Sequence, residues 1–431
     1  MHILRPGEHR AFFVVSLQPE KMEQVSVFEL SNGIRVVHQY MAREVIHCGL
    51  LIGAGSRDER KDEHGLAHFL EHCFFKGTRK RKTFHILSRL DAVGGELNAF
   101  TAKEETWLHA SVLKPHLERA VELLADIAFN STFPAHEIVK EKAVILDEIN
   151  SYLDSPADMV FEEYDALYFG NHALGRSILG SEKSLASFGS KDLRAFRDRI
   201  LHPDHLVFAS AGPVQPDVLK NLLEKYFGDH IVVRQSLGRR RFKPQGAKSR
   251  TVQKDIHQVH YLLGFPAYDY PSEKRPALTL INNILGGPGL NNRLSLNIRE
   301  KYGFAYHIDS TYAPFTDTGI FSIYLGTDKK YLSKSQQLIW KELKVFRDKP
   351  MSDKALREAK QQLCGQIAIS QDSGSATMFN LGKSLLLFDR IDTIEEVYAR
   401  IHRISAKEMQ DVANEIFDPL MMTELVYEPQ G

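Results

Sequence analysis

The chain has 431 residues, of which 43% are hydrophobic and 26% are charged. This composition is typical of a globular protein, and the length predicts two or three domains rather than one. The 55 Lys and Arg residues equal the 55 Asp and Glu residues in number. The charge therefore gives no electrostatic reason to expect a nucleic acid or an anionic membrane as partner.

The sequence carries no sign of a membrane span or a secretory signal. No apolar run approaches the ~18 residues that cross a bilayer, and residues 1–24 contain only the short apolar patch Ala11–Val15. A secretory core needs about 7–15 apolar residues. The three cysteines are an odd number without paired spacing, as in a reducing compartment. We expect a cytoplasmic protein, with residues 1–24 as a loose N-terminal extension.

From residue 25 onward, strand-like and helix-like segments alternate irregularly. The segments rich in β-branched and apolar residues predict strands, and the segments with apolar residues at i, i+3 and i+4 predict helices. Gly94-Gly95 predicts a hairpin-like return. Together these features favour an α+β fold with a mostly antiparallel sheet backed by helices. The predicted strands are GIRVVHQY, HCGLLIGAG and ETWLHASVL, and the predicted helices are HLERAVELLADIAFN and HEIVKEKAVILDEINSYL.

The chain then repeats itself. The apolar stripe of residues 134–156 matches that of residues 351–373 at an offset of 217, and the prolines of 202–213 match those of 418–429 at an offset of 216. A nearly constant offset of about half the chain indicates a tandem duplication of one domain. The predicted units are an extension (1–24), a first domain (25–232), a linker (233–250) and a second homologous domain (251–431).

The predicted linker is rich in Arg, Lys, Gly and Pro and lacks apolar periodicity. Its basic run Arg239–Arg241 could be a nucleic-acid patch. We favour the interpretation that it is a solvated linker.

The segment GLAHFLEHCFFKGT (65–78) carries the residues of greatest chemical interest. On a helix, His68, Glu71 and His72 share one face because residues three and four apart are neighbours. Two imidazoles one turn apart can hold one zinc ion, with the glutamate beside it as a proton acceptor. The alternative is a helix that merely carries two surface histidines. The apolar flanking residues argue against it, because burying two histidines and a carboxylate without partners is costly.

A catalytic zinc ion needs a third protein ligand and an open position. Glu141 and Glu148 are two turns apart on one predicted helix face, whereas Asp147 points about 100° away. At the offset of 217, Glu148 corresponds to Gly365 and Glu141 to Glu358. Glu148 is therefore present only in the half that carries the histidine pair.

These motifs resemble the pitrilysin/insulinase family of zinc metallopeptidases, whose members include the mitochondrial processing peptidase. The H-x-x-E-H order is the inverzincin signature, and GGELNAFTAKEETWLHA, Glu141 and Glu148 follow it at the family's spacing. The resemblance covers nearly the whole chain. It implies a zinc peptidase with one zinc per chain on His68, His72 and Glu148, with Glu71 as general base and Glu141 as a supporting residue.

The resemblance also implies how a peptide is bound. The strand 96–102 is expected to be an edge strand to which the peptide adds as a further strand, against Asn98, Ala99 and Phe100. Arg299 and Tyr306 resemble the family's Arg–Tyr pair, which steadies the bound peptide carbonyl across from the zinc. Family chambers contain four such domains, so the resemblance implies a homodimer in which zinc of one subunit faces Arg299 and Tyr306 of the other.

Two alternatives remain open at this point. One is a non-catalytic chamber or core subunit that binds peptides, against which the intact ligand set argues. The other is a zinc hydrolase of non-peptide substrates. The residues do not decide which peptide is preferred.

Overall fold

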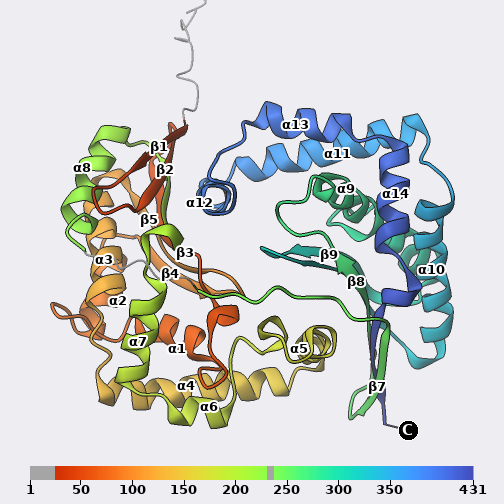
Figure 1. Cartoon of the computed structure of the whole chain (residues 1–431), viewed down its shortest axis with the longest axis horizontal. Helices are drawn as coiled ribbons and strands as arrows, with labels where there is room; N and C mark the ends of the chain where they lie inside the picture. The colour runs from red at the N-terminus through yellow and green to blue at the C-terminus, as the bar shows by residue number, and fades with distance from the viewer. Residues whose placement is uncertain (1–24, 231–236, 431) are drawn as a thin grey trace, which may run out of the picture.

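Two sheets, each backed by helices, form the two halves of the chain (Figure 1). The computed structural model describes residues 25–230 and 237–430. The strands of the first half are β1 (Val25–Glu29), β2 (Arg35–Tyr40), β3 (Val45–Ile52), β4 (Glu96–Thr101), β5 (Thr106–Leu113) and β6 (Leu206–Gly212). Its helices are α1 (Leu66–Cys73), α2 (Thr83–Asp91), α3 (Leu117–Asn130), α4 (Ala135–Leu153), α5 (Pro156–Phe169), α6 (Glu182–Ser187), α7 (Ser190–Ile200) and α8 (Pro216–Phe227).

The second half repeats this plan. Its strands are β7 (Lys248–Lys254), β8 (Val259–Ala267), β9 (Ala305–Pro314), β10 (Gly319–Thr327) and β11 (Thr423–Pro429). Its helices are α9 (Arg275–Gly286), α10 (Leu332–Asp348), α11 (Asp353–Gln371), α12 (Gly374–Phe388), α13 (Ile394–Arg403) and α14 (Ala406–Ile416), with a π-helical segment at Ser295–Glu300.

The strand orders confirm the duplication. The first sheet runs β1-β2-β6-β3-β5-β4 and the second runs β7-β11-β8-β10-β9. After the additional strand β1, the two orders correspond strand for strand. Each sheet has one parallel pair, β2 with β6 and β7 with β11, and its other pairs are antiparallel. The predicted mostly antiparallel α+β fold is therefore correct, and so are the three strands and two helices predicted from the first half.

The hairpin predicted at Gly94-Gly95 is wrong. These glycines join the end of α2 to the start of β4, and the antiparallel return lies instead between β4 and β5. Gly94 has a φ of 71°, which favours glycine at a helix end. A Cβ on Gly95 would lie 2.7 Å from Val112 Cγ1. Gly95 thus permits close packing on the sheet. In the sequence, a glycine needed for packing cannot be told from a glycine needed for a turn.

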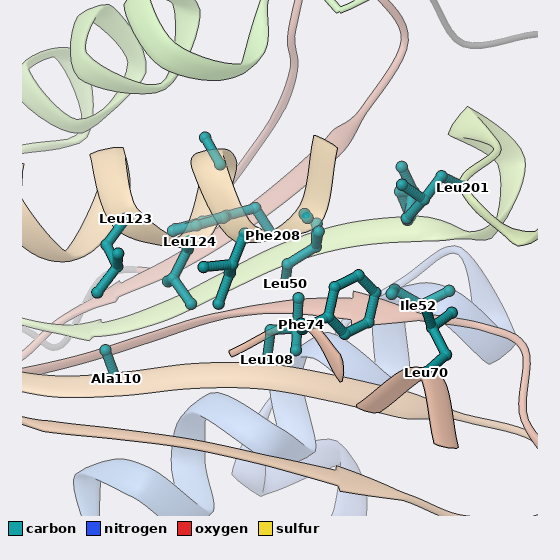
Figure 2. Close-up of a cluster of buried hydrophobic side chains, with 14 of the residues drawn as sticks. Leu50, Ile52, Leu70, Phe74, Leu108, Ala110, Leu123, Leu124, Leu201 and Phe208 are labelled. Carbon is teal, nitrogen blue, oxygen red and sulfur yellow. The ribbon is translucent and has the colours of Figure 1, made fainter. Parts of the chain in front are cut away.

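The main core of the first half lies between its sheet and helices α1 and α3. Figure 2 shows Leu50 and Ile52 of β3 meeting Leu70 and Phe74 from the region of α1 and Leu124 of α3. All of these side chains are buried. Burial contributes roughly 1.5–3 kcal/mol for each large apolar side chain, so α1 is held firmly against the sheet.

The opposite face of each sheet is covered by a helix from the other half of the chain. Helix α12 of the second half packs on the first sheet, with Met378, Leu381 and Leu385 against Trp107. Helix α5 packs on the second sheet, with Tyr164 among its buried residues. In Figure 1, α12 is seen end-on beside the first sheet and α5 lies below the second. This exchange gives each sheet two covered faces.

A buried ionic cluster also joins the halves. The Arg57 guanidinium, 1% exposed, donates to Asp317 of the second half at 2.7 Å and pairs with Glu104 at 2.5 Å. Arg239 of the predicted linker pairs with Asp58 at 2.7 Å and donates to the Gly53 carbonyl at 2.9 Å. The interpretation of Arg239 as a solvated linker residue is therefore wrong. Its partners come from distant segments, so local composition could not reveal them.

The predicted domain boundaries stay predictions. Residues 1–24, predicted as an extension, lie outside the described residues. Strand β7 begins at Lys248, so the last three residues of the predicted linker 233–250 belong to the second sheet.

Candidate metal centre

Helix α1 presents its three polar residues together because its apolar residues are taken up by the core. Leu66, Phe69, Leu70 and Cys73 are buried in the core of the first half. The remaining face of this short helix carries His68, Glu71 and His72. The shared face predicted from their spacing is therefore present.

The start of α1 is fixed by two residues outside the motif. Gly65 has a φ of 90°, and a Cβ there would lie 2.6 Å from the Gly180 Cα, so only glycine fits. The buried Glu59 carboxylate accepts the backbone N–H of Gly65 at 3.1 Å and that of Ala67 at 2.8 Å. These bonds satisfy N–H groups that a helix start leaves unpaired. The sequence analysis missed Glu59; an acidic residue shortly before a helix is a signal for such a cap.

The two histidines and Glu148 converge on one point. His68 Nε2 and His72 Nε2 each lie 3.7 Å from Glu148 Oε2. One donor atom from each residue lies within 4.8 Å of the others, and this is the one such group found among residues 25–230 and 237–430. Helix α4 therefore brings Glu148 to the histidine pair from 76 residues further along the chain. Asp147 does not belong to this group.

The chemistry of this donor set fits a zinc ion. Two imidazoles and one carboxylate form a typical catalytic zinc set, which leaves a fourth position open. Burial, together with the neighbouring His72, lowers the pKa of His68 to about 3. His68 is thus neutral, which is the form that binds metal. Its Nδ1 is buried without a hydrogen-bond partner in the described chain.

Glu141 orients the His72 ring through Nδ1, the ring nitrogen that does not face Glu148. Its Oε1 accepts from His72 Nδ1 at 2.8 Å, and its Oε2 pairs with Lys76 Nζ at 2.5 Å. A carboxylate bonded to the outer nitrogen of a metal-ligating histidine fixes the ring and its tautomer. Burial opposes ionisation of Glu141, but His72 and Lys76 hold its pKa below the ordinary value. Lys76 was not predicted from the sequence, because it lies beyond the end of α1 at Cys73.

Glu71 lies beside the donor group without belonging to it. Burial raises the pKa of Glu71, and the neighbouring Thr101 and His72 counteract part of that effect. Thr101 ends β4, so the carboxylate lies where the edge of the first sheet meets α1. Burial alone would lower the pKa of His72, yet Glu141 and the charges of Glu71 and Glu148 raise it. A cation held at this point would therefore meet surrounding negative charge.

Strand β4 is the outer strand of the first sheet, with β5 as its only sheet neighbour among the described strands. Its outer edge is available for hydrogen bonding to a further strand. Asn98 and Phe100 point to one face and are exposed, while Ala99 points to the other and packs against the helical core. The Phe100 ring lies 5.6 Å from the Phe379 ring of α12. The three predicted substrate residues are thus divided between the two faces.

The structure does not bring Arg299 and Tyr306 to the donor group of the same chain. Arg299 lies in the π-helical segment, 3.6 Å from Glu300, and the Tyr306 hydroxyl donates to Asp328 at 3.0 Å. Tyr306 is 63% exposed. Neither side chain makes a hydrogen bond or ion pair to His68 or its companions within the described residues. Both side chains are therefore accessible to another molecule.

Comparison with known proteins decides the family. Residues 35–182 match the model described as insulinase (peptidase family M16), and residues 187–363 match that of the peptidase M16 inactive domain. A Bacillus subtilis (strain 168) relative, named uncharacterized zinc protease YmxG, is 34% identical over 393 residues, 90% of this chain and 95% of the relative. The chain belongs to the insulinase family, peptidase family M16. The resemblance predicted from the motifs is confirmed.

A further relative agrees with this chain in length, and two solved structures agree with it in fold. An uncharacterized zinc protease of Rickettsia felis is 32% identical and covers 94% of this chain and 98% of its own. The crystal structure of a protease from Helicobacter pylori superposes with a TM-score of 0.89 at 21% identity, over 95% of this chain and 100% of that chain. A structure titled peptidase M16 inactive domain, from Pseudomonas fluorescens, gives 0.88 at 19% identity over 95% and 98%. The likeness to these two structures shows the fold.

Within the described residues, no helix is both long and apolar enough to cross a bilayer.

Proposed function

We propose that this M16 family member is a zinc-dependent metalloendopeptidase that holds one zinc ion per chain on His68, His72 and Glu148. The single observation that carries the proposal is the convergence of two Nε2 atoms on one Glu148 oxygen, each at 3.7 Å. Relatives that match nearly the whole chain are named zinc proteases, which adds support. A bound zinc ion would supply Lewis-acid polarisation of the scissile carbonyl and of the attacking water.

Glu71 is the proton carrier of the reaction. The water oxygen adds to the carbonyl carbon while the Glu71 carboxylate takes a water proton. When the carbon–nitrogen bond breaks, Glu71 returns that proton to the leaving amine. No covalent intermediate is needed, so the reaction requires no serine or cysteine nucleophile. Glu141, bonded to His72 at 2.8 Å and supported by Lys76, keeps the His72 ring in the required tautomer.

The peptide binds as a further strand on the outer edge of β4. Main-chain hydrogen bonds along this edge accept an extended peptide of almost any sequence. Side chains of the peptide then alternate between the two faces. Those on one face meet Asn98 and Phe100, whereas those on the other face lie over Ala99. Thr101 ends the strand beside Glu71, so the scissile bond lies near that end.

The working unit is a homodimer with composite sites. The exposed Tyr306 and Arg299 of one subunit face the zinc site of the other and donate to the carbonyl oxygen as it gains negative charge. The support for this arrangement is that neither residue reaches the donor group of its own chain. Two chains of two domains would enclose a chamber.

One experiment tests the activity directly. The zinc-loaded protein is incubated with a mixed peptide library, and new termini are identified by mass spectrometry, with Glu71→Gln as the matched inactive control. We expect internal cuts from the wild type and none from Glu71→Gln. A wild type that binds zinc yet leaves all peptides intact would favour a non-catalytic subunit if peptides are retained. It would favour a hydrolase of non-peptide substrates if they are not.

A further inference from the structure

A second site, far in sequence from the zinc motif, centres on Arg275. This arginine begins α9, and its guanidinium carbon lies 5.2 Å from the ring centre of Phe388 and 6.0 Å from that of Tyr270. Its Nε is buried and has no hydrogen-bond partner, and no carboxylate lies within ion-pair distance of it among the residues that the structure describes. A partly buried cation without an anion is costly.

Two cavities meet at this arginine. One has a volume of about 470 Å³ and the other about 320 Å³, and Arg275, Phe388 and Arg400 line both. Sites for small ligands typically have volumes of about 300–1,000 Å³. The cavities are lined by residues of α12, which covers the first sheet, and by residues of α9 and α13.

The larger cavity is the charged end of the site. Arg390 pairs with Asp392 and Glu396, and Arg400 pairs with Asp392. Glu273 and Glu408 also line this cavity. Arg403 lines it too, and its Nε donates to the Ala399 carbonyl of its own helix rather than to an acid. Within the described residues, Arg275 and Arg403 are thus the arginines of this cavity that have no ion-pair partner. Aromatic rings lie near the faces of the Arg275 guanidinium, so its N–H donors point outward along its edge. This edge matches the planar, bidentate geometry of a carboxylate.

The smaller cavity combines an aliphatic wall with polar side chains such as Asn380 and Ser384. Its wall includes the aliphatic side chains of Leu363, Ile367, Leu381, Ile394, Val397 and Ile401. A ligand that fills both cavities therefore needs an anionic head and an aliphatic body. Inorganic phosphate or a sugar would match only one of the two surroundings.

We propose that the junction of α9, α12 and α13 binds an aliphatic carboxylate, with its head on Arg275 and its chain in the cavity lined by Val397. This binding does not depend on the zinc site. A ligand there touches α9 and α13 together with α12, the helix that covers the first sheet, so its binding stabilises the folded chain by mass action.

Calorimetric titration of the full chain with octanoate tests the proposal. We expect saturable binding of one octanoate per chain. Octanamide, of the same length but without charge, should bind at least ~10-fold more weakly, since it cannot form a charge-assisted hydrogen bond with Arg275. Arg275→Gln should cause a similar loss, whereas Arg357→Gln, an exposed arginine on α11, should leave the affinity unchanged.

A second variant covers the case in which Arg275→Gln fails to fold. Val397→Phe fills the smaller cavity but retains Arg275, so it should weaken octanoate binding while acetate binding stays the same. Octanoate affinity that is equal for the wild type and Val397→Phe would overturn the proposal. Equal affinity for octanoate and octanamide would overturn it as well.

Discussion

The helix pair α1 and α4 of the first half corresponds to the pair α9 and α11 of the second, yet the two pairs bury different chemistry. In the first pair, Glu141 is 4% exposed and bonded to His72. Its counterpart Glu358 has a side chain that is 66% exposed and lies 4.0 Å from Lys354 at the surface. Glu148 corresponds to Gly365, and an added Cβ there would meet nothing within 4 Å.

This difference shows that the same arrangement of strands and helices can hold either a polar site or an apolar core. Helix α9 buries Leu278, Leu280 and Ile281, whereas α1 carries two histidines and a glutamate on one face. Because the sheet orders correspond, the presence of the donor set is decided by a few side chains rather than by the fold. The donor group on the first pair can therefore be altered without loss of the sheets.

The largest expected effect follows from removing the donors. His68→Ala combined with His72→Ala should reduce zinc from about one ion per chain to none, because one carboxylate cannot hold it alone. Elemental analysis of the purified protein measures this. The matched control is His260→Ala combined with His307→Ala in the second half, which should retain zinc. Full zinc in the first variant would refute the assignment.

Removing the proton carrier should have the next largest effect. Glu71→Gln keeps the shape of the side chain and leaves the donor set intact, so zinc content and melting temperature should not change. The rate of peptide cleavage should fall by at least the ~10²–10⁴-fold typical of a lost general acid–base group. Near-normal turnover of this variant, measured with a fluorogenic peptide, would show that another group carries the proton.

Glu141 and Glu358 offer a direct comparison of equivalent positions. Glu141→Gln should weaken zinc binding by roughly 10–100-fold, the usual consequence of losing the carboxylate behind a metal-ligating histidine. Glu358→Gln should have no effect, because that residue is exposed. Competition with a zinc chelator measures both. Equal affinities in the two variants would mean that the bond from Glu141 to His72 does not support the site.

The same comparison shows what the sequence could and could not predict. The shared face of His68 and His72 follows from helix periodicity, and the choice of Glu148 follows from the repeat, so both were accessible. The sequence could not predict the pairing of Arg239 with Asp58. Nor could it predict that α5 and α12 each cover the sheet of the other half. Both features depend on contacts between segments more than a hundred residues apart, and such contacts leave no local periodic signal. Lys76 was missed because α1 ends before it.

A mixed dimer tests whether the second half of one chain serves the first half of another. Glu71→Gln and Arg299→Ala should each be inactive as homodimers. After random subunit exchange, half of the dimers contain both variants, and each of these has one intact site. Activity should return to roughly a quarter of the wild-type value. If subunits exchange and no activity returns, Arg299 does not act across the dimer.

The smallest expected effect concerns two buried histidines, one in each sheet. His38 Nε2 donates to the Val214 carbonyl at 2.9 Å, and His38 Nδ1 shares a hydrogen bond with Ser210 Oγ at 2.8 Å. His260 contacts the Tyr324 hydroxyl at 2.8 Å. Burial lowers the pKa of both residues below the ordinary value of 6.5.

Because the folded pKa values are lowered, the unfolded chain binds more protons once the pH falls below about 6.5. The free energy of unfolding should therefore be highest above that pH and decrease on acidification. Glutamine at either position cannot take the proton, so the free energy of unfolding should decrease less on acidification. Denaturant unfolding at several pH values measures this. His38 is 0% exposed and His260 is 6% exposed, so His38→Gln should reduce the decrease more. A steeper decrease in either variant would contradict the assignment of that histidine as neutral in the folded chain.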